Sequence, residues 1–158
     1  MELSVSLLLQ QLFVGLALGA IYVLVAVGLS LIFGLLGVVN FAHGAFYMLG
    51  AYVAVYAYGL TGSFWWCLLL VPLAVGLLGL VAERWLIRPL YGRGVDYPLL
   101  LTFGLAYVLV DGVRMVWGVQ GEAFATPEAL RGAVDLGFGV FPLYRLFLLG
   151  LWAALLLA

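Results

Sequence analysis

The feature that most constrains this chain is a run of 47 almost uninterrupted apolar residues, 12–58. One helix needs about 20 apolar residues to cross a bilayer, so the run is roughly twice as long as a single span. Its middle, 34–44, carries three glycines, Asn40 and His43, which is the only histidine of the chain. Irregular backbone with polar groups at membrane depth is tolerated only against protein or a water-filled cavity. The sequence therefore predicts two membrane segments joined by a polar break.

Composition supports a membrane protein and argues against several other classes. Of the 158 residues, 68% are hydrophobic and 8% are charged, whereas a soluble domain carries about a quarter charged residues. No basic patch interleaved with aromatics indicates nucleic-acid binding. Gly-x-Ser-x-Gly, His-Glu-x-x-His and paired intramembrane aspartates are missing, so an intramembrane enzyme has no candidate catalytic residues. The N-terminal residues hold no Lys or Arg, so we interpret the first apolar segment as a retained span and not a signal peptide.

Hydropathy predicts an all-α fold, a polytopic membrane helix bundle with four to five transmembrane or half-membrane helices. The second segment has 18 residues and would measure about 27 Å, so it is either a marginal full crossing or a half-helix entered from the break. Asn40 stands where it would cap a helix that starts at Phe41. The predicted segments are 12–36, 41–58, 64–87, 99–117 and 142–158.

The two longer connections differ in charge. Three of the six basic residues lie in the connection 88–98 or just before it, and arginine excess in a short loop marks the cytoplasmic side. The connection 118–141 carries three acids and one arginine, which suits the outer face. Within it, residues 134–141 alternate loosely around glycines, a pattern that favours a short β-hairpin.

Small residues form a stripe along the first segment. Gly15 and Gly19 have the small-xxx-small spacing that lets two helices touch backbone to backbone, and Gly34 and Gly37 continue the stripe. The stripe serves either packing within one subunit or a dimer face.

Cys67 is the only cysteine, so it forms no internal disulfide and is predicted to be a small buried or lipid-facing side chain.

Polar groups inside the apolar segments are the candidates for function. Two interpretations stay open for the break, which either lines a translocation path or acts as a structural clasp. Asp111 and Arg114 are three residues apart on one helix face and can pair, either as an interfacial ion pair or as part of a substrate site. No metal site is predicted, because no second ligand stands near the histidine. The candidates for the path or the break are Asn40, His43, Gly44 and Tyr47.

The break and its flanks resemble LivH-type permeases, the membrane subunits of branched-chain amino acid ABC importers. The resemblance runs continuously over about 12–117 and more weakly over the rest. Its motifs are Gly-Leu-Ala-Leu-Gly-Ala-Ile-Tyr at 15–22, Gly-Leu-Ser-Leu-Ile-Phe-Gly at 28–34, Gly-Val-Val-Asn-Phe-Ala-His-Gly at 37–44, Tyr-Met-Leu-Gly-Ala-Tyr at 47–52, Glu-Arg at 83–84 with Arg-Pro-Leu at 88–90, and Leu-Thr-Phe-Gly at 101–104.

The resemblance implies a permease subunit, not an enzyme, in the bacterial or archaeal cytoplasmic (inner) membrane. Its solute would be a branched-chain amino acid, another amino acid or urea. The implied partners are a second permease subunit, similar or identical, two ATP-binding subunits and an extracytoplasmic solute-binding protein. ATP and Mg would bind the partner subunits, because this chain has no phosphate loop. Many relatives carry an acid directly after the His-Gly pair, whereas this chain has Ala45, which weakens any proton-relay role.

The family continues into a cytoplasmic coupling loop and a second group of helices. The last apolar segment of this chain is still apolar at residue 158 and has no flanking charge. We therefore interpret the chain as the N-terminal portion of a permease domain. The alternative is a truncated or non-transporting membrane scaffold.

The charge asymmetry makes a prediction about topology. Arg84, Arg88 and Arg93 should be cytoplasmic, and the connection 118–141 should be outside. Single cysteines at positions 93 and 128, introduced into a Cys67→Ser background, can be treated with an impermeant thiol reagent in intact cells. We expect labelling at 128 and none at 93. Labelling at 93 would reverse the orientation.

Overall fold

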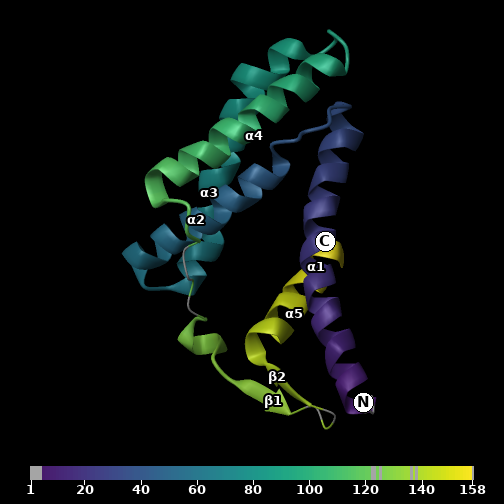
Figure 1. The fold of residues 1–158 in the computed structure, drawn as a ribbon, viewed down its shortest axis with the longest axis vertical. Helices are drawn as coiled ribbons and strands as arrows, with labels where there is room; N and C mark the ends of the chain where they lie inside the picture. The colour runs from purple at the N-terminus through teal and green to yellow at the C-terminus, as the bar shows by residue number, and fades with distance from the viewer. Residues whose placement is uncertain (1–4, 122–123, 125, 136, 138, 158) are drawn as a thin grey trace. The chain divides into compact units, whose positions relative to one another are not determined.

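The computed structural model describes residues 5–121, 124, 126–135, 137 and 139–157. It has the predicted all-α fold, to which a small strand pair is a minor addition (Figure 1). The α-helices are α1 (Val5–Leu36), α2 (His43–Thr61), α3 (Phe64–Ala82), α4 (Asp96–Trp117) and α5 (Leu143–Leu157). The other elements are a π-helical turn (Glu83–Ile87), 3-10 turns (Arg88–Leu90 and Glu128–Leu130), and strands β1 (Ala133–Asp135) and β2 (Val140–Pro142).

Three helical stretches of the described chain are long and apolar enough to cross a membrane. They are Leu7–Leu36, Phe64–Leu90 and Asp96–Trp117, and the apolar α5 is shorter. Large apolar side chains are exposed along these helices, which is typical of helices surrounded by lipid or by another subunit. The chain is therefore a multi-pass membrane protein.

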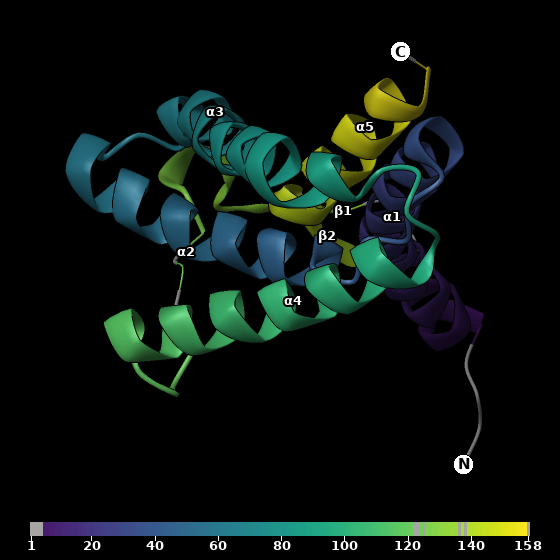
Figure 2. The ribbon, with the colours of Figure 1, turned by 90° about the horizontal axis from the view of Figure 1, so that it is seen from above.

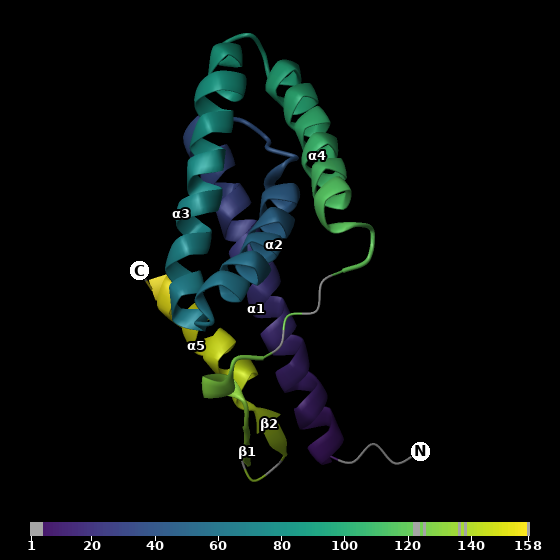
Figure 3. The ribbon, with the colours of Figure 1, turned by 90° about the vertical axis from the view of Figure 1, so that its left-hand side faces the viewer.

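The chain divides into two compact units, and α1 contributes to both. Unit 2, Gly28–Phe124, contains the end of α1 together with α2, α3 and α4. Helix α2 packs against both α3 and α4 and lies between them (Figure 2). Helices α3 and α4 run in opposite directions and are joined at one end of the unit (Figure 3). Cys67 is buried where α3 meets α2, and its Sγ lies 3.7 Å from the Ala54 carbonyl oxygen.

Unit 1, Met1–Val27 with Ala125–Ala158, contains the start of α1, the strand pair and α5. Strands β1 and β2 are antiparallel, with Val134 opposite Phe141, so the predicted hairpin is confirmed. Phe141 is buried, and its ring centroid lies 4.3 Å from that of Phe13 on α1. Six residues covered by the predicted segments and connections lie outside the described part of the chain, namely Glu122, Ala123 and Ala125 of the outer connection, Leu136 and Phe138 of the hairpin, and Ala158.

Several predicted boundaries differ from the observed ones. Helix α1 begins at Val5 and not at residue 12, because the residues before the predicted segment are themselves helical. Helix α2 covers His43–Thr61 in place of 41–58, and it ends where Gly62 adopts a left-handed φ of 63°. Helix α4 begins at Asp96 and not at 99. The prediction placed Pro98 in the loop. A proline is tolerated in the first turn of a helix, because the N–H that it lacks would have no partner within the helix there.

Candidate functional site at the break between α1 and α2

Helix α1 ends at a glycine in the left-handed conformation. Gly37 has φ of 65°, and its N–H donates to the Phe33 carbonyl oxygen at 2.8 Å. This is a common helix ending, because glycine reaches positive φ without a steric cost from Cβ. Gly37 is thus the glycine that stops the helix, while Gly34 and Gly44 lie inside α1 and α2.

Alternate residues of the segment after Gly37 are buried, and its own polar groups fix its conformation. Val38, Asn40 and Ala42 are all buried. The Asn40 Oδ1 accepts the Ala42 N–H at 3.0 Å, and the Asn40 carbonyl oxygen accepts the His43 N–H at 3.2 Å. An asparagine that bonds the backbone two residues on forms an Asx turn. The predicted cap is therefore corrected, since the Asn40 side chain caps the turn before α2 and the helix starts at His43.

Thr102 of α4 holds the same segment from the other side, and no role was predicted for it. Its side chain is fully buried at 0% exposure, and its Oγ1 accepts the Phe41 N–H at 3.2 Å across 61 positions of sequence. The hydroxyl can donate to the carbonyl oxygen of Leu99 at 3.1 Å or of Val39 at 3.3 Å. A threonine within an apolar span was the available signal, because such hydroxyls often bond across membrane helices.

The His43 side chain packs closely against α1 at Gly28. A Cβ placed on Gly28 would lie 3.0 Å from the imidazole Cε1 and 3.1 Å from Nε2. Such contacts are tighter than ordinary packing, so Gly28 sets how closely α1 and the start of α2 approach. At Gly15, Gly19 and Gly34, a Cβ would meet no described atom within 4 Å. Their role in packing stays a prediction.

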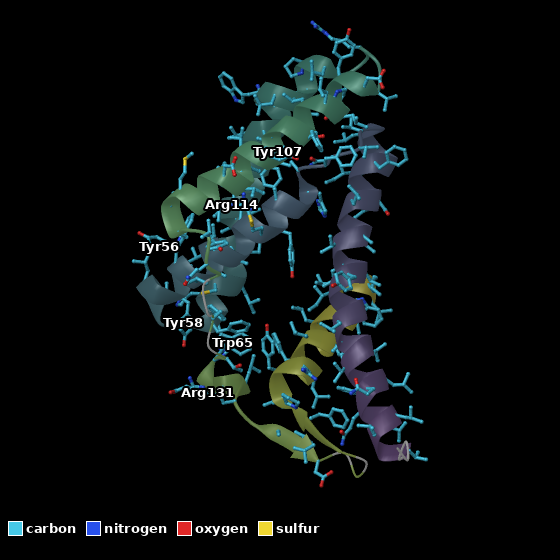
Figure 4. All side chains as sticks on the ribbon, in the orientation of Figure 1. Tyr56, Tyr58, Trp65, Tyr107, Arg114 and Arg131 are labelled. Atoms are coloured by element: carbon cyan, nitrogen blue, oxygen red, sulfur yellow. The ribbon has the colours of Figure 1, made fainter. Side chains whose placement is uncertain are left out.

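The remaining candidate residues take no part in the contacts described for the break. Gly44 and Tyr47 are exposed on α2. Arg114 Nη1 lies 3.3 Å from Asp111 Oδ1, and both side chains are more than half exposed. The ion pair expected from their spacing is therefore present on α4, where Figure 4 labels Arg114. Asp111 is nine residues from Thr102, roughly 14 Å along the helix. Within the described part of the chain, no three His, Cys, Asp or Glu side chains gather where they could hold a metal.

The contact with Thr102 also places the break along the helices of unit 2. Thr102 is six residues from the start of α4 at Asp96, which is roughly 9 Å of helical rise. Helix α2 therefore starts about two turns below the end of unit 2 at which α3 and α4 are joined. A break at that level is inside the span Asp96–Trp117 but away from its middle.

Together, the apolar helices and the buried break define a multi-pass membrane protein with a discontinuous pair of helices. Residues 11–158 match the family described as branched-chain amino acid transport system, permease component. The chain belongs to this family.

Curated relatives agree with the family. The chain is 32% identical over 127 residues to the high-affinity branched-chain amino acid transport system permease protein BraD of Pseudomonas aeruginosa, covering 75% of this chain and 41% of BraD. It is 36% identical over 144 residues to the permease protein LivH of Salmonella typhimurium, covering 82% of this chain and 44% of LivH. The chain thus matches less than half of the length of these relatives. No solved structure matches it.

The Thr102 contact gives a test of how the break is held. Thr102→Val keeps the shape of the side chain but leaves the Phe41 N–H without its acceptor, which costs roughly 1–3 kcal/mol when the group is buried. We expect a lower midpoint of thermal unfolding in detergent and faster hydrogen exchange at the Phe41 amide. Thr102→Ser keeps the hydroxyl and should behave like the parent. Unchanged exchange at Phe41 in the valine variant would contradict this role.

The close approach at Gly28 gives a second test. Gly28→Ala should displace the His43 ring and destabilise the protein, since overpacking typically costs about 1–3 kcal/mol. Gly76→Ala, at an exposed helical position where a Cβ meets no described atom within 4 Å, should be neutral or slightly stabilising. His43→Ala should remove most of the penalty in the double variant, which a double-mutant cycle of unfolding midpoints would measure. Equal midpoints for Gly28→Ala and Gly76→Ala would refute the contact.

Proposed function

We propose that this chain forms part of the translocation path of an ABC importer for branched-chain or related amino acids in the cytoplasmic membrane. Family membership supports the transport class, and the names of the curated relatives support the solute. The observation that carries the proposal is the partly buried break at 37–42, whose backbone Asn40 and Thr102 hold by hydrogen bonds.

The start of α2 suits the acid end of an amino acid. The first turn of a helix presents backbone N–H groups and the positive end of the helix dipole, which favour a carboxylate nearby. His43 is the first residue of this helix and is partly accessible, so its imidazole adds a polar group at the same place. Neighbouring apolar side chains would accept the aliphatic side chain of the solute. Tight binding is not needed here if a separate solute-binding protein supplies the affinity.

The partners follow from the same proposal. A second permease subunit, similar or identical, would complete the path. Two ATP-binding subunits would carry ATP and Mg, and an extracytoplasmic solute-binding protein would deliver the amino acid. The apolar faces exposed on α3 and α4 are available for the second subunit and for lipid.

A transport measurement distinguishes the two possible roles of the break, a translocation path and a structural clasp. In the full-length permease assembled with its subunits, Asn40→Leu should reduce radiolabelled leucine uptake several-fold more than it reduces the quantity of assembled complex. His43→Gln keeps a hydrogen-bonding side chain of similar reach, so it should be milder than His43→Leu. Uptake per assembled complex is the quantity to compare, with Thr102→Ser as the control that keeps the clasp. If the Asn40 and His43 variants lose uptake only in proportion to assembly, the break is a clasp and the path is elsewhere.

A further inference from the structure

The end of unit 2 that joins α3 to α4 combines exposed arginines with exposed aromatic rings. Arg84, Arg88 and Arg93 are all exposed there, and no ion pair within the described chain uses them. Trp85 is 74% exposed, and Tyr97 is also exposed. We call residues 83–97 the arginine tip. Large aromatic rings open to water are unfavourable, but at a membrane interface the ring sits in the apolar zone and its polar atom reaches the headgroups.

Helix geometry sets the arginine tip at the level of the lipid headgroups. Trp65 at the start of α3 is 58% exposed, and it lies with Tyr56 and Tyr58 at the end of unit 2 opposite the tip (Figure 4). Trp85 follows it by twenty residues along a nearly continuous helix, which is roughly 30 Å of helical rise. That distance equals the hydrocarbon thickness of a typical bilayer. Exposed tryptophans therefore lie at both membrane interfaces along one helix. The three arginines are within eight residues of Trp85, the tryptophan at the second interface.

Two acids, Glu83 and Asp96, belong to the arginine tip, and neither forms an ion pair with an arginine within the described chain. The Tyr91 hydroxyl donates to the Glu83 Oε1 at 3.1 Å. Partial burial, the hydrogen bond to Glu83 and the Glu83 charge raise the pKa of Tyr91, against a smaller lowering by Arg88. The raised pKa keeps the Tyr91 hydroxyl protonated at neutral pH, so it donates to the Glu83 carboxylate. No ion pair within the described chain occupies the three arginines, whose N–H donors are available to another anion.

We infer that the arginine tip binds the phosphate of anionic phospholipid headgroups in the adjoining leaflet. Guanidinium groups bind phosphate oxygens through paired N–H donors, and basic groups close to an anionic leaflet are attracted to it. The occupant is the lipid surface, because Trp85 and Tyr97 share the tip with the arginines and require an apolar layer beside the phosphates.

Lipid retention tests this inference without reference to transport. The full-length permease with its subunits is exchanged into micelles containing phosphatidylglycerol or phosphatidylcholine, and native mass spectrometry counts the lipids that stay bound. We expect selective retention of phosphatidylglycerol. Each arginine replaced by glutamine should weaken that retention about fivefold. Replacing all three by lysine keeps the charge, and with it the topology, and should weaken retention less than the glutamine series does.

Controls distinguish the occupants. Arg131→Gln removes an arginine that is already paired with Glu128 in unit 1, so it should leave phosphatidylglycerol retention unchanged. Retention that is equal in the parent and in the triple glutamine variant overturns the inference. Displacement of the lipid by millimolar inorganic phosphate would instead assign the arginines to free phosphate. Loss of the ATP-binding subunit with lipid retention intact would assign the tip to protein docking, which also overturns it.

Discussion

Backbone polar groups that leave a helix inside a membrane must find partners within the protein, because hydrocarbon offers none and each unpaired group costs several kcal/mol. Three N–H groups of the segment 37–42 meet this demand with three different acceptors. The Phe33 carbonyl takes the Gly37 N–H, the Asn40 side chain takes the Ala42 N–H, and Thr102 takes the Phe41 N–H. Two of these come from the segment and the helix before it, and the third comes from α4. The hydrogen bond from Thr102 therefore makes α4 one of the elements that stabilise the break.

This dependence explains the arrangement of unit 2. Helix α2 starts roughly two turns below the end of unit 2 at which α3 and α4 are joined, and the segment 37–42 connects it to α1. Small buried residues, among them Ala45 and Ala57, allow α2 to lie close to the helices on both sides. A sideways movement of α4 at Thr102 would pull directly on the Phe41 amide, so the conformation of the break and the position of α4 are mechanically linked.

The sequence identified the break but not everything that holds it. Gly37, Asn40 and His43 stood out because polar and glycine residues are rare within so long an apolar run, and local chemistry was enough to give a turn there. Gly28 and Thr102 belong to motifs of the resemblance, but their roles could not be predicted, since their partners are 15 and 61 positions away and only the folded chain brings them together. Helix ends set by local capping were found closely, as at Leu36 and Trp117. The predicted helix starts were wrong in two cases. Helix α1 is extended to Val5 by adjoining residues, and helix α4 has Pro98 in its first turn.

The length of α1 has a further consequence. Its apolar stretch Leu7–Leu36 has 30 residues, or about 45 Å of rise, which exceeds the hydrocarbon thickness by roughly 15 Å. Such hydrophobic mismatch is normally relieved by tilt or by local thickening of the bilayer. Here part of the excess is covered by protein, because Phe13 stacks on Phe141 and Gln10 approaches Gly139 of the hairpin. The hairpin thereby shortens the length of α1 that lipid has to match, so the thickness of the membrane that suits this protein depends on a structure outside its membrane spans.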